Sequence, residues 1–221
     1  MLVFKLLVEG NDDQDFFKAC CQKLGLISVD VFPPKIIAAS TGDGCGNLIT
    51  NLPILLAQIK AGDIDKFGII LDADFPPNNR GGFTSRYKLI TNQLKDFGYI
   101  IPRKTAFTKG SVFAHSDGLP DIGLWIMPDH QGDGMLENFI ESIISSESDQ
   151  QSLLSYADSV IDKLPIKLFN EKLRSSKAKV FTWRAWQNRP GLPLNKALND
   201  GILNTSKAPN FEVWLKSTFK Q

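Results

Sequence analysis

Four short apolar runs, each followed by a helical pattern, occupy the first two thirds of the chain. The runs lie at residues 2–8, 36–40, 67–72 and 122–127, and apolar residues then recur every three to four positions. Apolar runs of this length, ended by Gly or Pro, are typical of strands buried on both faces of a parallel sheet. We therefore predict an α/β fold with a Rossmann-like, mostly parallel sheet flanked by helices. Residues 26–34 indicate a short edge strand, and residues 100–120 a hairpin or an irregular insert.

The last third of the chain has a different pattern. Residues 149–164 and 167–187, and two shorter segments ending near Phe219, have helical spacing, and no strand-like run follows Met127. Small and polar residues at 145–148 form the best candidate boundary. We predict an α/β domain at residues 1–146 and an all-helical C-terminal extension at 147–221, packed on it or continuous with it as one domain.

Composition and charge exclude some classes of protein. The chain has 221 residues, is 43% hydrophobic and 22% charged, and so resembles an ordinary soluble domain. Its 25 Lys and Arg nearly balance its 24 Asp and Glu, which excludes a strongly basic DNA-coating protein but leaves room for a local basic groove. No apolar stretch approaches the ~20 residues of a membrane span. Three cysteines without zinc-ligand spacing indicate reduced core residues, so we expect a cytoplasmic protein with no membrane partner.

Acidic residues occur where three of the predicted strands end. Asp72 and Asp74 terminate the third run, and residues two apart on a strand point to the same side. Glu9 directly follows the first run, and Glu137 lies in the first helical turn after the fourth. These positions share one edge of a parallel sheet, where open α/β sheets bind ligands. Clustered carboxylates favour Mg²⁺ or Mn²⁺ as a cofactor, and Gly10 next to Glu9 would let a substrate approach a general acid or base.

The order of these motifs resembles a known family. Residues 7–13 (Leu-Val-Glu-Gly-Asn-Asp-Asp) and the Asp-Ala-Asp segment at 72–74 resemble the Toprim domain of primases, topoisomerases, RNase M5-type maturases and OLD-family nucleases, over about two thirds of the chain. The whole chain looks like an uncharacterised bacterial Toprim-related family. The segments that carry this closer resemblance are residues 8–13, 71–74, 125–137 and 183–191.

The resemblance implies roles for individual residues. Glu9 would be the general acid or base, and Asp72 and Asp74 would bind Mg²⁺ or Mn²⁺. Glu137 or Asp13 would complete a second metal position, as in the nuclease branch. The implied function is phosphoryl transfer on nucleic acid, above all phosphodiester cleavage by a nuclease. Two alternatives stay open: a non-catalytic module that binds nucleic acid or a partner protein, and a phosphatase or transferase acting on a small phosphorylated molecule.

Further residues are candidates for substrate contact, each with a simpler alternative. Asp13 can cap the first helix, since acidic residues stabilise helix N-termini. Lys109 in the insert could bind phosphate or be an exposed lysine, and His130 after the fourth run could touch substrate or be an ordinary loop histidine. Arg184, beside two tryptophans three residues apart, could reach a nucleic-acid backbone, whereas the tryptophans would pack the tail onto the sheet. The sequence does not indicate the oligomeric state.

Overall fold

The computed structural model describes residues 2–34, 44–76, 81–102 and 109–220. It contains a five-stranded sheet in the order β2-β1-β3-β5-β4. The strands are β1 (Phe4–Leu7), β2 (Val29–Phe32), β3 (Lys66–Asp72), β4 (Ser111–Phe113) and β5 (Ile122–Met127). β2, β1, β3 and β5 pair in parallel, whereas β4 pairs antiparallel with β5. The predicted mostly parallel α/β sheet is thus confirmed, while the strand predicted at 36–40 lies outside the described residues.

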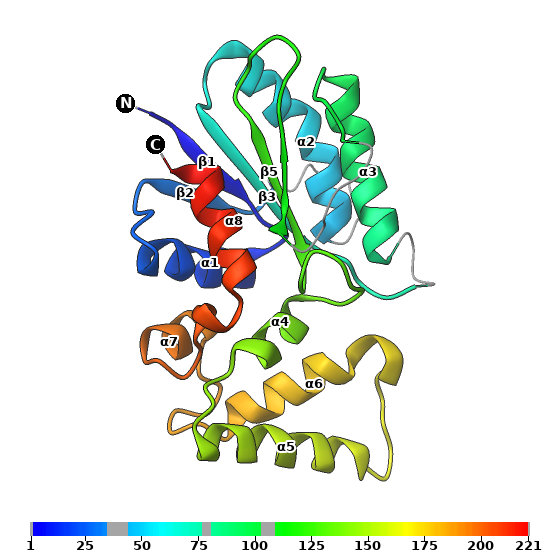
Figure 1. Ribbon diagram of the computed structural model, residues 1–221. Coiled ribbons are helices and arrows are strands. Elements are labelled where there is room, and N and C mark those ends of the chain that lie inside the picture. Colours follow the sequence, from blue (N-terminus) through cyan, green and yellow to red (C-terminus); the bar gives the residue numbers. More distant parts are fainter. Residues whose placement is uncertain (1, 35–43, 77–80, 103–108, 221) are drawn as a thin grey trace.

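Helices cover both faces of this sheet (Figure 1). α2 (Gly44–Ala61) and α3 (Phe83–Asp96) lie on one face, and α1 (Asn11–Lys23) and α8 (Pro209–Phe219) on the other. The strand residues alternate accordingly. Phe67, Ile69 and Leu71 pack into the core on the α2–α3 side, whereas Ile70 of the same strand packs into the core on the α1–α8 side. This alternation with both faces apolar explains why the sequence shows unbroken hydrophobic runs.

The helical C-terminal region is confirmed and contributes to the core of the α/β part. It consists of α5 (Ser148–Asp162), α6 (Glu171–Ala185), α7 (Leu194–Asn199) and α8, preceded by α4 (Leu136–Ile143) after β5. α5 and α6 form the lower part of the molecule, whereas α8 returns to the sheet (Figure 1). Trp183, Trp214 and Phe219 share one hydrophobic cluster with Phe4 and Trp125. α8 therefore completes one face of the sheet, and Trp183 of α6 extends the same hydrophobic cluster.

Two glycines let α8 approach the sheet closely. A Cβ on Gly68 of β3 would lie 3.0 Å from the ring of Phe219, and a Cβ on Gly123 of β5 would lie 2.4 Å from Oγ1 of Thr218. A Cβ at Gly123 would therefore clash with α8, and a Cβ at Gly68 would require the Phe219 ring to shift by a few tenths of an ångström.

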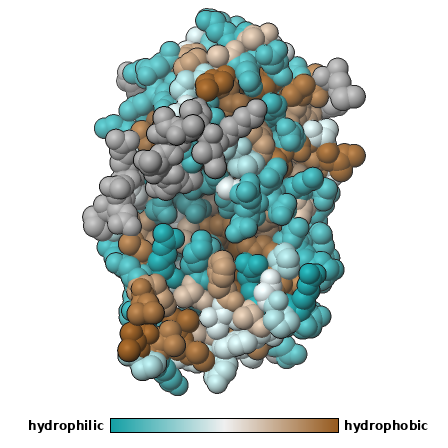
Figure 2. Space-filling model, turned by 180° about the vertical axis from the view of Figure 1, so that it is seen from behind, coloured by the Kyte–Doolittle hydropathy of each residue, from teal (hydrophilic) through white to brown (hydrophobic). Residues whose placement is uncertain are grey.

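At the other end of the molecule, Ile166 and Leu168 between α5 and α6 are 72% and 96% exposed, and Figure 2 shows a hydrophobic patch there.

Among the described residues, the structure contains no helix that is long and apolar enough to cross a membrane.

Candidate functional site

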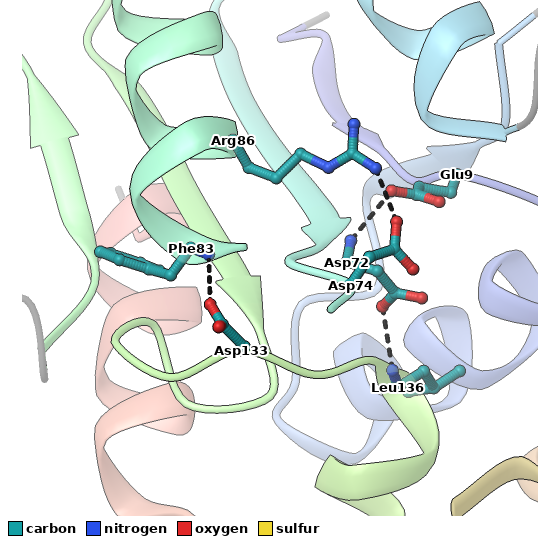
Figure 3. A network of polar contacts seen from close by, with 7 residues as sticks. All are labelled: Glu9, Asp72, Asp74, Phe83, Arg86, Asp133 and Leu136. Carbon is teal, nitrogen blue, oxygen red and sulfur yellow. Dashed lines mark hydrogen bonds and ion pairs between the residues drawn. The ribbon is translucent and has the colours of Figure 1, made fainter. Parts of the chain in front are cut away.

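Three neighbouring strands bring polar groups together at one edge of the sheet. Glu9 follows β1 by two residues, Asp72 is the last residue of β3, and Leu136 begins α4 shortly after β5. The Asp72 N–H donates to Oε1 of Glu9 at 2.9 Å, and the Leu136 N–H donates to Oδ1 of Asp72 at 2.9 Å (Figure 3). These two bonds hold the carboxylates of Glu9 and Asp72 at the carboxyl ends of adjacent parallel strands, the ligand-binding edge of open α/β sheets.

Asp74 joins this cluster through a turn rather than through strand alternation. β3 ends at Asp72, and Asp74 has φ 59°, in the left-handed region that Asp tolerates better than most residues. Its N–H donates to the carbonyl of Gly134 at 2.6 Å, and the Gly134 N–H donates to the Asp74 carbonyl at 3.2 Å. The Asp74 carboxylate points toward Glu9 and Arg86, whereas the Asp72 carboxylate points toward the Leu136 N–H (Figure 3). Asp72 and Asp74 were expected to lie close together as alternate residues of one strand, but in the structure a turn after β3 brings Asp74 into the cluster.

Arg86 is a residue of this site that sequence reasoning missed. It projects from α3, is only 4% exposed, and its Nη2 lies 2.6 Å from Oδ2 of Asp74 (Figure 3). Buried charges need a partner of opposite sign, and Asp74 supplies it. The sequence did contain a signal, because Arg86, Ile90 and Leu94 are spaced by four residues on the apolar face of α3. A charged residue on an apolar helix face indicates a buried ion pair.

A cavity of about 600 Å³ lies at this edge, with an acidic and a basic wall. The acidic wall comes from the strand ends, α1 and α4. Its carboxylates are Glu9, Asp12, Asp13, Asp15, Asp72, Asp74 and Glu137. The other wall comes from α6, which contributes Arg174, Lys177, Phe181 and Arg184. The structure therefore brings together the four carboxylates expected from the sequence, Glu9, Asp72, Asp74 and Glu137, and adds a basic wall that the sequence analysis foresaw only at Arg184.

Burial and mutual repulsion raise the pKa values of the carboxyl groups at this site. Burial raises the pKa of Glu9 to about 8, with Asp74 and Asp13 adding to the rise, while the hydrogen bond from Asp72 and the charge of Arg86 oppose it. Burial also raises the pKa of Asp72 well above its usual range, and the neighbouring acids Glu9, Asp13, Glu137 and Asp74 raise it further. In the metal-free protein these pKa shifts favour the protonated forms of Glu9 and Asp72, and a bound cation would favour their charged forms.

Glu137 and Asp13, the two candidates for a second metal position, each have a protein partner. Glu137 is 8% exposed, and its Oε1 lies 3.1 Å from Nζ of Lys177 on α6. Oδ2 of Asp13 accepts a hydrogen bond from the Gly10 N–H at 2.8 Å, which caps α1. Burial raises the pKa of Asp13 to about 6, and the charge of Glu137 adds to this rise. Both carboxylates line the cavity, and Asp13 has the helix-capping contact that was its alternative role.

The donor chemistry of the acidic wall suits a divalent cation. Within the described ranges, no three His, Cys, Asp or Glu side chains are already arranged as a metal-binding group. Arg86 pairs with Asp74 and Lys177 with Glu137, whereas the contacts found for Glu9, Asp13 and Asp72 are hydrogen bonds from backbone N–H groups. Hard carboxylate oxygens are the ligands that Mg²⁺ and Mn²⁺ prefer, so the residues present are compatible with such an ion.

The remaining candidate residues lie in different surroundings. Gly10 lines the cavity beside Glu9. Arg184 also lines it, and its Nε donates to the carbonyl of Leu192 at 2.7 Å. Lys109 is an exposed residue just before β4, and it is absent from the cavity walls that the described residues form.

His130 is fully buried, outside the cavity. The Ile126 N–H donates to its Nδ1 at 2.9 Å, so Nε2 carries the proton and donates to Oγ of Ser111, also at 2.9 Å. Burial lowers the pKa of His130 to about 3, so its ring is neutral at physiological pH. Its contacts connect β4 with β5, and this position makes it part of the scaffold rather than of the cavity lining.

Comparison with known proteins identifies the family of this chain. A protein-family model described as "Protein of unknown function (DUF3226)" matches residues 3–220, which is nearly the whole chain. No curated protein and no solved structure matches this chain.

Proposed function

We propose that this chain, which belongs to the DUF3226 family of unknown function, is a Mg²⁺- or Mn²⁺-dependent phosphoryl-transfer enzyme of Toprim-like type that cleaves phosphodiester bonds in nucleic acid. The observation that carries the proposal is the convergence of Glu9, Asp72, Asp74 and Glu137 on one cavity at the carboxyl edge of a parallel sheet. Had these side chains lain apart, a nuclease centre assembled from them would be untenable.

The cation would be held by Asp72 and Asp74, with Glu137 as a further carboxylate of the same cavity. When bound, such an ion polarises the phosphate and stabilises the charge that develops in the transition state. The chain supplies the anchoring for this arrangement, because the Leu136 N–H fixes Asp72 and Arg86 fixes Asp74. Rigid positioning of this kind lowers the cost of reaching the transition state.

Glu9 is placed to move a proton rather than to hold the cation. Its Oε1 is occupied by the Asp72 N–H, which orients the carboxyl group, and Oε2 has no comparable backbone bond among the described residues. Gly10 follows it directly, so no side chain at that position obstructs a substrate approaching the carboxyl group. Glu9 would therefore take the proton from the attacking group or return one to the leaving group.

The basic wall of the cavity supports a phosphorylated substrate. Arg174, Lys177 and Arg184 line the same cavity as the carboxylates, although the whole chain carries a net charge of only +1. A concentration of positive side chains opposite an acidic centre favours a polyanion that must reach a cation. This arrangement supports an enzyme over a non-catalytic module, since a binding surface alone has no need of several carboxylates that repel one another.

Cleavage of labelled oligonucleotides tests the proposal. Single- and double-stranded DNA and RNA are incubated with the protein in Mg²⁺, Mn²⁺ or EDTA, beside Asp72→Asn. Asparagine keeps an oxygen that can accept from the Leu136 N–H but removes the charge. We expect cleavage with metal, none in EDTA, and a loss of about 100-fold or more in the variant. Cleavage that is equal in Asp72→Asn, or no cleavage of any substrate, would refute the assignment. Asp96→Asn, at an exposed position of α3 that is not among the cavity-lining residues, is the matched control and should leave cleavage unchanged.

A further inference from the structure

The cavity wall formed by α6 carries an aromatic side chain set between two cations. Lys177 Nζ lies 5.8 Å, and the Arg184 guanidinium carbon 5.1 Å, from the centroid of the Phe181 ring. Phe181 is nevertheless 47% exposed. Because the ring lies on the cavity wall between two cations, its exposed face is available to a ligand that enters the cavity.

The basic and aromatic residues form one continuous strip. Residues 174, 177, 181 and 184 are spaced by three, four and three positions, which places them on one face of a helix. All four line the cavity that contains Glu9 and Asp72. The strip is held to the acidic wall where Lys177 pairs with Glu137, and at its C-terminal end Arg184 donates to the carbonyl of Leu192, which follows α6 in the chain. Arg174, by contrast, is exposed.

We propose that this strip (Arg174, Lys177, Phe181 and Arg184) binds single-stranded nucleic acid, with an unpaired base stacked on Phe181 and backbone phosphates on the cations. This inference deepens the proposed function and rests on it for the choice of nucleic acid as substrate. Alternating cations and an exposed ring are what single-strand binding requires, because phosphates need positive charge and every base offers a flat face for stacking.

The position of the carboxylates argues against an intact duplex. Glu137 is 8% exposed, and Glu9 and Asp72 lie partly buried at the sheet edge, so a scissile phosphate must enter the cavity. A flexible single strand can bend into a recess of about 600 Å³, whereas a base-paired helix is stiff and keeps its bases stacked within the duplex. In a duplex the exposed face of Phe181 would have no base available.

Binding in EDTA tests this strip independently of catalysis. Fluorescence anisotropy is measured with labelled single strands of about 12 nucleotides, DNA and RNA, and with the corresponding duplexes. We expect the single strands to bind more tightly than the duplexes, and Phe181→Ala to weaken single-strand binding by about 5- to 150-fold. Tyr156→Ala is the matched control, because Tyr156 is a 63% exposed aromatic residue of α5 that is not among the cavity-lining residues. It should leave the affinity unchanged.

The salt dependence of binding tests whether the cations of the strip contact backbone phosphates. Arg174→Gln should reduce the slope of log K against log salt by about 0.7, the value for one lost phosphate contact on a single strand. Lys172→Gln, an exposed lysine of α6 outside the strip, should leave the slope unchanged. Urea denaturation of each variant verifies that the fold is intact.

The two proposals fail in different ways. If folded Phe181→Ala and Arg174→Gln bind single strands as the unaltered protein does, or if duplexes bind as tightly as single strands, the α6 strip is not the binding surface, even where metal-dependent cleavage occurs. If single strands bind in EDTA with the expected dependence on Phe181 but Mg²⁺ and Mn²⁺ produce no cleavage, the inference about the strip holds and the nuclease function falls.

Discussion

Arg86 offers the sharpest test of how the acidic wall is held together. The change Arg86→Met removes the charge from α3 while keeping a long apolar side chain in the same buried position. Asp74 then loses the cation that lies 2.6 Å from its carboxylate. Its charge remains close to Glu9 and Asp72, whose pKa values are already raised by burial and by their acidic neighbours. The metal-free protein should therefore lose stability.

The expected loss follows from the burial of the two partners. Removing one member of a buried ion pair typically costs about 3–5 kcal/mol. Arg86 is 4% exposed, but the Asp74 side chain is 36% exposed, so water screens part of the unpaired charge. We expect a loss of about 2–3 kcal/mol in the free energy of unfolding. For a chain of this length, that corresponds to a fall in Tm of roughly 4–12 °C.

Urea denaturation in EDTA measures this loss, and a second variant identifies its cause. Arg86→Met combined with Asp74→Asn removes both charges and should recover at least half of the stability, because no uncompensated carboxylate remains. Lys196→Met is the matched control. It breaks an ion pair whose side chains are 52% and 38% exposed and should cost at most about 1 kcal/mol. If Arg86→Met costs no more than Lys196→Met, or if Asp74→Asn restores nothing, the ion pair does not neutralise the acidic wall.

Three further predictions address other parts of the molecule. Glu9→Gln keeps an oxygen that can accept from the Asp72 N–H, so cleavage should fall about 10²- to 10⁴-fold while Mn²⁺ affinity, measured by titration calorimetry, changes little; a parallel loss of affinity would make Glu9 a metal ligand. His130 has a pKa of about 3 in the folded protein and 6.5 when unfolded, so its neutral form stabilises the fold above pH 6.5 and this contribution is lost as pH falls toward 3. Between pH 7 and pH 5 the stability advantage over His130→Gln, measured in urea, should shrink by about 2 kcal/mol, and a constant difference would contradict this. Gly123→Ala should destabilise by about 1–3 kcal/mol because its Cβ would lie 2.4 Å from Thr218 Oγ1, and Thr218→Ala should recover part of the loss; equal stability of Gly123→Ala and the unaltered protein would contradict the close approach of α8.

Local pattern was sufficient to predict the central parallel strands and the acidic residues at their ends. The run from Phe67 to Asp72 forms β3, and the run from Ile122 to Met127 forms β5, because continuous apolar residues bury both faces of a strand. Once these strands are parallel, geometry places Glu9 and Asp72 at one edge, as expected. These features depend only on neighbours in sequence and on the general rules of parallel strand pairing, so a single sequence is enough to predict them.

Contacts between distant segments determined the position of Asp74, its ion-pair partner and the basic wall of the cavity. The turn that brings Asp74 beside Asp72 depends on a bridge to Gly134, sixty residues later, and the partner of Asp74 comes from α3. The basic wall depends on how α6 folds back over α4, where Lys177 meets Glu137. The helical spacing of α6 is visible in the sequence, but its orientation is set by side-chain packing, which periodicity does not specify. The sequence therefore determined the carboxylates and the sheet that carries them, whereas the tertiary structure decided which cations and which aromatic ring face them.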